Sequence, residues 1–216
     1  MLDRKGHHAR KCACGGDRVR CHNDARNLVG RFASAAGHNP TLEKPGLLQP
    51  SPDQPGAQRR RPADVFLPSW LEGRPAALDI AITSPQRLEI IQEASTRMGS
   101  AAAAYEAFKR AHLNTAEDCI AQGMAFIPMI AETSGGWGTS AICTLKALSR
   151  AAAARSDRSS GFILSEQLQL LGSAIRRAKA RAVLRRDTGS ENLVSSAFAS
   201  AAAVLHEDAG SPAVET

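Results

Sequence analysis

Two short apolar runs joined by a proline-bounded connection constrain the fold of this chain more than any other feature. The runs span residues 63–67 and 77–83, and the connection between them reads PSWLEGRP. Runs of this length, bounded by proline and glycine, are typical of the two strands of a β-hairpin. Each run carries an aspartate, Asp64 and Asp79, where a strand usually carries an aliphatic side chain. The sequence therefore predicts a hairpin with two carboxylates in it.

The spacing of apolar residues predicts helices on both sides of this hairpin. A third strand is expected over residues 124–131, and residues 37–58, which contain five prolines, are expected to form a loop. Helices are expected over residues 23–36, 86–111 with a weak point at Gly99, 139–155 and 161–186. This order predicts an α/β fold, with a mixed sheet of few strands flanked by helices and a C-terminal helical extension.

Asp64 and Asp79 are candidate ligands of a divalent cation. Neighbouring strands lie about 5 Å apart, so acids on both strands can converge on one point. Buried carboxylates are costly unless they are neutralised, and Mg²⁺ combines carboxylates with waters and phosphate oxygens. Such a cation activates water and stabilises the charge of a phosphodiester during cleavage. The alternative is that both acids lie at strand ends, solvated or paired with Arg60, Arg61 or Arg74.

Residues 43–85 resemble a known nuclease domain. They read EKPGLLQPSPDQPGAQRRRPADVFLPSWLEGRPAALDIAITSP, and they are similar to the restriction-like endonuclease domain of non-LTR retrotransposon polyproteins, a member of the PD-(D/E)XK superfamily. The family pattern of a basic residue, proline, aspartate and a later acid is matched by Arg61-Pro62-Ala63-Asp64 and Asp79, with one extra residue before Asp64. Upstream, KCACGGDRVRCHNDAR resembles the Cys/His knuckle and basic-histidine segment of the family, and the resemblance covers about residues 7–186.

The resemblance implies a restriction-endonuclease-like core that cuts DNA with Mg²⁺. Asp64 and Asp79 would bind the metal, and Glu43 would be the additional acid near the first helix. The lysine that the superfamily carries two residues after the second acid is replaced here by Ala81. In several relatives this lysine lies on the following helix, which makes Lys109 the candidate; the alternative is an ordinary solvated lysine.

Two further polar residues lie near these candidates in the sequence. His112 follows Lys109 on the same expected helix, and Glu132 follows the third strand. Each could reach the site or face water. Trp70 and Trp137 are both flanked by turn residues, and each either fills the core or stacks on a base.

The N-terminal segment carries a cluster of soft metal ligands. A tetrahedral Zn²⁺ would use His8, Cys12, Cys14 and His22, with His7 and Cys21 as alternates. A bound metal can fold a segment that has almost no core of its own. The alternative is a set of free thiols in a basic arm.

The charge of the chain favours a polyanionic partner. The net charge is +6 and the pI is about 9.4, and the stretch IRRAKARAVLRR places six cations in twelve residues. We expect DNA, with RNA as an alternative, to contact Arg59, Arg60, Arg61, Arg177, Arg181 and Arg185. An ordinary solvated face is the alternative for this helix. No run of 18 apolar residues is present, so no membrane partner is expected.

Four parts of the chain are expected from these patterns. They are a zinc-binding arm (1–23), the nuclease core (24–150), a helical extension (151–188) and a poorly ordered tail (189–216). The N-terminus lacks the apolar stretch of a secretory signal, and an intracellular, nuclear location is expected. The chain would be a fragment of a longer polyprotein, a domesticated copy or a decayed one. The rival function is a zinc-containing protein that binds nucleic acid without cutting it.

Overall fold

The computed structural model describes residues 16–48 and 60–184, and everything below concerns those residues. Their contacts separate a unit of residues Arg18–Arg176 from a second unit, of which residues 16–17 and 177–184 are described. The first unit contains the whole sheet and all of the candidate catalytic residues. The expected tail (189–216) and most of the expected zinc arm (1–23) lie outside the described residues.

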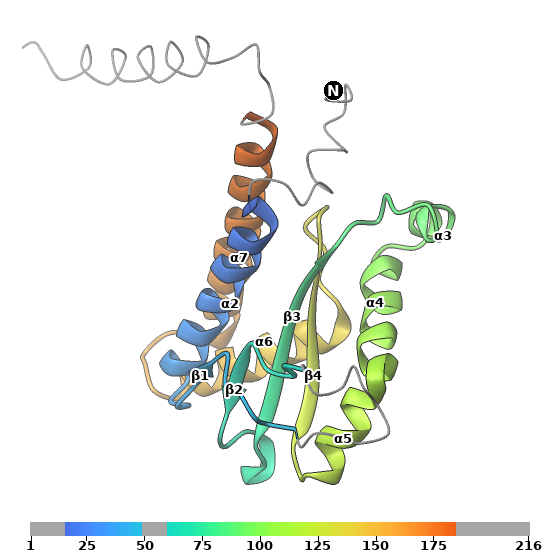
Figure 1. Ribbon diagram of the computed structural model, residues 1–216. Coiled ribbons are helices and arrows are strands. Elements are labelled where there is room, and N and C mark those ends of the chain that lie inside the picture. The colour runs from blue at the N-terminus through green and yellow to red at the C-terminus, as the bar shows by residue number, and fades with distance from the viewer. Residues whose placement is uncertain (1–15, 49–59, 185–216) are drawn as a thin grey trace, which may run out of the picture. The chain divides into compact units, whose positions relative to one another are not determined.

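A mixed four-stranded sheet forms the centre of the Arg18–Arg176 unit (Figure 1). Its strands, in spatial as well as sequence order, are β1 (Thr41–Leu42), β2 (Val65–Leu67), β3 (Ala76–Thr83) and β4 (Ala125–Glu132). The β1–β2 and β2–β3 pairs are antiparallel, and β3 and β4 are parallel. The antiparallel pair β2–β3 is the hairpin predicted from sequence, and its connection contains the short helix η3 (Leu71–Gly73).

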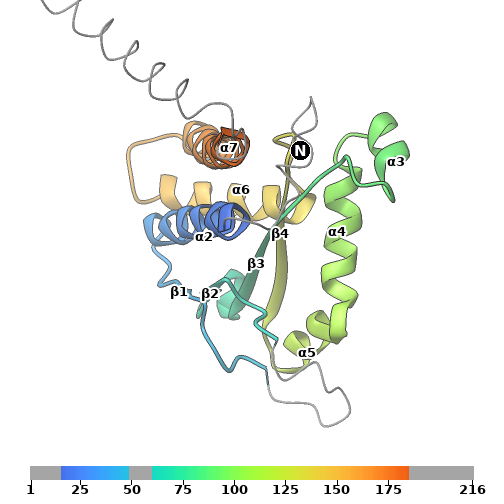
Figure 2. The same ribbon diagram turned by 45° about the horizontal axis from the view of Figure 1, so that its top comes forward.

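Helices cover both faces of this sheet. The helices of the described residues are α2 (Asp17–Ala35), α3 (Ile91–Thr96), α4 (Ser100–Ala111), η4 (His112–Asn114), α5 (Thr115–Ala121), α6 (Thr139–Ala153) and α7 (Ser160–Leu184). Helices α3, α4 and α5 make the crossover between the parallel strands β3 and β4, as the parallel pairing requires. In Figure 2, α2 and α6 lie on one side of the sheet and α4 on the other. Among the described residues, no helix is both long and apolar enough to span a membrane.

The alternation of side chains along β3 divides the core into two layers. Leu78 and Ile80 point into the larger apolar cluster, which also contains residues of α2 and α6. Ala77 points the other way, into a smaller cluster with Cys119 of α5 and Phe126 of β4. Successive residues of a strand face opposite sides of the sheet, so Asp79 shares the face of Ala77, the one that α4 and α5 cover.

The predicted elements agree with the structure in most places. The three expected strands and the four expected helical ranges are all present, and the break at Gly99 separates α3 from α4 with a left-handed φ of 80°. Helix α2 starts earlier than expected, at Asp17. The expected loop 37–58 contains the two-residue strand β1, which was not predicted, and α5 was not predicted either.

Candidate active site

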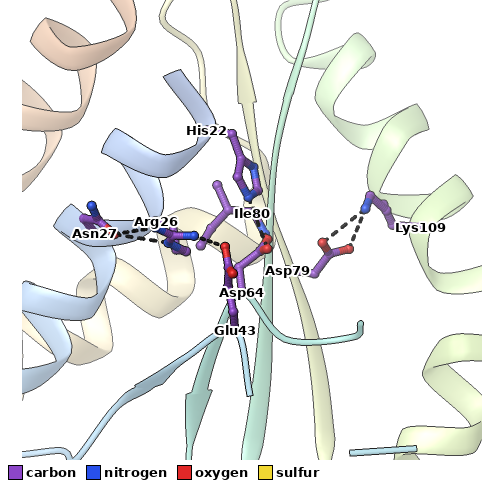
Figure 3. A network of polar contacts seen from close by, with 8 residues as sticks. All are labelled: His22, Arg26, Asn27, Glu43, Asp64, Asp79, Ile80 and Lys109. Atoms are coloured by element: carbon purple, nitrogen blue, oxygen red, sulfur yellow. Dashed lines mark hydrogen bonds and ion pairs between the residues drawn. The ribbon is translucent and has the colours of Figure 1, made fainter. Parts of the chain in front are cut away.

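Asp64 extends the sheet with its side chain. Strand β2 has three residues and β3 has eight, so β3 continues past the point at which β2 begins. The Asp64 backbone N–H donates to Leu78 O (2.9 Å), and the Asp64 carboxylate oxygen Oδ2 accepts from the N–H of Ile80 (2.6 Å). The carboxylate therefore satisfies a backbone donor that has no β2 residue opposite it. This contact fixes one oxygen of Asp64 and leaves Oδ1 directed toward α2 (Figure 3).

Helix α2 supplies partners to the two acids on its side of the site. His22 Nε2 lies 3.1 Å from Asp64 Oδ1, and the hydrogen bond with Asp64 raises the pKa of His22 against the opposing effect of burial. One helical turn later, Arg26 contacts the Glu43 carboxylate, and the Arg26 side chain is only 12% exposed. Glu43 is held beside Asp64 because its backbone N–H donates to Asp64 O (2.9 Å). Residues four apart lie on one face of a helix, so both side chains of α2 reach this edge of the sheet.

Asp79 has its partner on the opposite helix, α4. Lys109 Nζ lies 2.8 Å from Asp79 Oδ2 and 3.1 Å from Oδ1, so the ammonium spans both carboxylate oxygens. The Asp79 side chain is 10% exposed and that of Lys109 is 25% exposed. Figure 3 shows α2 supplying partners to Asp64 and Glu43 from one side and α4 supplying Lys109 to Asp79 from the other.

Burial controls the charge of Asp79. Removal from water raises the pKa of Asp79 from 3.8 to about 6, although the charge of Lys109 and its hydrogen bond act in the opposite direction. Asp64 adds to the increase and His22 reduces it, so the two acids interact electrostatically. Desolvation alone would lower the pKa of Lys109, but the charge and hydrogen bond of Asp79 raise it, and Lys109 is therefore protonated at neutral pH.

A pocket of about 230 Å³ opens beside this pair of residues. Asp79, Lys109, His112 and Arg61 are among the residues that line it, together with Phe126 of β4. Arg61 is exposed. A pocket with one carboxylate and several cationic or protonatable side chains suits a phosphate group, since phosphate oxygens accept charge-assisted hydrogen bonds.

Arg60 also lines the pocket, but its guanidinium is engaged within the protein. Its side chain is only 4% exposed, and Nη1 donates to Leu113 O (2.6 Å) and contacts the Asp118 carboxylate. Leu113 has a left-handed φ of 52°, so the buried arginine holds a strained turn between α4 and α5. Arg60 therefore shapes the pocket wall, a structural role that the sequence did not indicate.

The remaining candidates from the sequence lie in different environments. Glu132 is buried, and its carboxylate accepts from Ala102 N (3.0 Å) and Ser134 Oγ (3.0 Å), so it anchors the start of α4. Arg177 is exposed on α7 and Arg181 is half-buried there, and both belong to the second unit. The expected contacts Arg59 and Arg185 lie outside the described residues.

Three of the four predicted zinc ligands, His8, Cys12 and Cys14, also lie outside the described residues. The fourth, His22, lies in α2 and contacts Asp64. In the part of the chain that the structure describes, no group of three or more His, Cys, Asp or Glu side chains is arranged to hold a metal ion by itself. The zinc site remains a prediction.

The Asp64 and Asp79 pair fits Mg²⁺ in its donor chemistry. Mg²⁺ in nucleotide-processing sites commonly takes only one or two protein carboxylates, and waters and substrate phosphates complete its shell. Burial raises the pKa of Asp79 to about 6 despite the contact with Lys109, and a bound cation would relieve the cost of the buried charge. A comparison of the chain with protein-family models and with curated proteins finds no match.

Proposed function

We propose that the chain is a metal-dependent endonuclease with a restriction-endonuclease-like core. The observation that carries the proposal is the contact of Lys109, from α4, with both oxygens of Asp79 on β3, beside Asp64. The family resemblance makes Lys109 the candidate for the amine that Ala81 cannot supply, and its contact with the second acid supports this assignment. The mixed sheet of four strands with helices on both faces agrees with such a core.

The side chains of the site would have different roles in the reaction. Asp64 and Asp79 would hold Mg²⁺, which when bound would activate water and stabilise charge on the phosphodiester. Lys109 keeps its proton at neutral pH, so it acts as a charged donor to the phosphate or to the attacking water, and not as a general base. Arg61 and His112, on the pocket wall, would face the phosphate of the bound strand.

The contacts of Glu43 make its role indirect. Its carboxylate pairs with Arg26, and its backbone supports Asp64. Glu43 would therefore position Asp64, and Arg26 would compensate the negative charge that three neighbouring acids accumulate. In an element of the kind that the sequence resembles, the nick would provide the primer for reverse transcription.

A second candidate function is nucleic-acid binding without cleavage. It is favoured by the protein partners that both acids already have, because His22 on Asp64 and Lys109 on Asp79 partly neutralise the charge that would attract a cation. A protein of this class would bind DNA equally well with and without Mg²⁺. The two functions therefore differ in their response to metal.

Nicking of supercoiled plasmid by the purified chain tests the proposal. Relaxed circles should form with Mg²⁺ and should not form with EDTA. Asp64→Asn and Lys109→Met should each reduce the rate at least about a hundred-fold, as expected when a group that stabilises the transition state is removed. Glu117→Gln and Lys146→Met are matched controls on exposed positions of α5 and α6, and they should nick at the rate of the unmodified chain.

Binding of the same plasmid should persist in the Asp64→Asn variant, because this change removes a negative charge that repels phosphate. If the unmodified chain binds DNA and never cuts it with Mg²⁺ or Mn²⁺, the binding function replaces the nuclease. If Asp64→Asn nicks at the unmodified rate, Asp64 has no place in the reaction.

A further inference from the structure

Three rings form a continuous row along α4 and its C-terminal end. Tyr105 and Phe108 have ring centroids 5.5 Å apart at an interplanar angle of 35°, and Phe108 and His112 are 5.1 Å apart at 30°. We call these three residues the aromatic ladder. Their spacing of three and four residues places them on one face of the helix. The chain contains one tyrosine and six phenylalanines, so this ladder uses a scarce type of side chain.

The ladder borders the candidate active site. His112 and Lys109 both line the pocket that contains Asp79. Tyr105 lies one turn before Lys109, and its hydroxyl is among the groups that raise the pKa of Lys109. The rings therefore follow the same side of α4 as the lysine that contacts the acid.

The ladder is open at Phe108 and His112, whereas Tyr105 is half-buried with Arg87 over its ring. Phe108 is 50% exposed, although the chain has few aromatic residues with which to fill its core, and His112 is exposed beside it. The guanidinium of Arg87 lies 5.9 Å from the centre of the Tyr105 ring, and Glu89 is close to Arg87. At the other end, the exposed Arg61 lines the pocket. Exposed rings next to the cationic Arg61 complement a ligand that is flat and anionic.

We propose that the aromatic ladder stacks the unpaired bases of a single DNA strand whose backbone phosphate enters the neighbouring pocket. Proteins that bind single strands combine cationic grooves for the backbone with aromatic side chains for the bases. Phe108 and His112 are the exposed rings of the ladder, and unpaired bases would stack on them. Bases inside a duplex are already stacked on each other, so only an unpaired strand can occupy the ladder.

This inference rests on the proposed function in one respect: the strand that the ladder holds is the strand that the acids would cut. The preferred substrate is then DNA with an unpaired stretch next to the scissile phosphate, such as a junction, a bubble or a free end. A fully paired duplex would bind through its phosphates alone, and more weakly.

Equilibrium binding in EDTA tests the ladder without any cleavage. Fluorescence anisotropy would compare a labelled oligothymidylate with an abasic oligonucleotide of the same length and charge. The unmodified chain should bind the oligothymidylate more tightly, by about five- to 150-fold for each stacked base. Phe108→Ala should remove most of this difference and leave binding of the abasic strand unchanged, and Phe108→Trp should restore it.

Phe162→Ala is the matched control, because Phe162 is a 62% exposed phenylalanine on α7, with Arg158 over its ring. This variant should keep the preference for bases. The proposal is overturned if the unmodified chain binds both strands equally, or if Phe108→Ala and Phe162→Ala give the same result; the ladder would then serve another partner, such as a protein. Loss of the preference in Phe108→Ala in a chain that never nicks plasmid would support the ladder and reject the nuclease. Nicking by a chain that shows no preference for bases would support the nuclease and reject the ladder.

Discussion

The buried carboxylate of Asp79 should make the protein lose stability as pH rises toward neutrality. Asp79 is 10% exposed, and burial raises its pKa from 3.8 to about 6 despite the contact with Lys109. The folded protein therefore binds the Asp79 proton more tightly than the unfolded chain does. The substitution Asp79→Asn keeps the size of the side chain and removes the titration.

The size of this effect follows from the difference between the two pKa values. One pKa unit corresponds to about 1.4 kcal/mol, so the shift of Asp79 is worth about 3 kcal/mol. Its sign follows from linkage: stability from the protonated carboxyl is fully present below pH 3.8, and it is lost as pH rises through about 6. The free energy of unfolding of Asp79→Asn, minus that of the unmodified protein, should therefore increase by about 3 kcal/mol across this interval.

Urea denaturation in EDTA, followed by tryptophan fluorescence at a series of pH values, would measure this difference, since Trp70 belongs to the core. In the variant, Lys109 loses its partner. This loss adds a constant to the difference in unfolding free energy, because Lys109 stays protonated throughout this pH range. Only the change of the difference with pH therefore tests the reasoning. A difference that is constant, or that decreases as pH rises, would show that attraction to Lys109 outweighs burial and that Asp79 ionises at its ordinary pKa or below.

Three further predictions concern neighbouring groups. Arg60→Ala should lower the free energy of unfolding by about 1–3 kcal/mol in urea denaturation, because it leaves Leu113 O and Asp118 without a buried donor; a smaller loss would show that water replaces the guanidinium. His22→Ala should cost more stability at pH 6 than at pH 8, because the raised pKa of His22 means that its contribution is present below 6.5 and lost above the folded value; equal costs would contradict this. The rate of plasmid nicking should fall as pH decreases below about 6, because a proton on Asp79 competes with the cation; a flat profile would exclude Asp79 as a ligand.

The hairpin and its acids could be predicted because their signals are local. Proline and glycine bound both strands, and the apolar runs are long enough to show their period. Strand β1 has only two residues, both exposed, and it exists because it pairs with β2, so no periodicity could reveal it. Helix α5 follows two left-handed residues, Leu113 and Asn114, whose conformation depends on tertiary contacts such as that of Arg60.

The site shows the same division between local and tertiary information. Only the family resemblance predicts that Lys109 belongs to the site of Asp79, because 30 residues separate the two and no local pattern connects them. The neighbours of His22 in sequence predict a zinc ligand, whereas in the fold His22 contacts Asp64, which is 42 residues away. The aromatic ladder does have a sequence signal, because Tyr105, Phe108 and His112 are spaced three and four residues apart.

The central claim is that Asp64 and Asp79 together bind a divalent cation, and Mn²⁺ binding measured by electron paramagnetic resonance tests it most directly. The titration would use the unmodified chain, Asp64→Asn, Asp79→Asn and the control Glu117→Gln, each with a short DNA oligonucleotide present to supply phosphate oxygens. We predict a bound Mn²⁺ in the unmodified chain and in Glu117→Gln that both aspartate variants lose. Mn²⁺ that stays bound in both aspartate variants, or that binds none of the four proteins, would contradict the account.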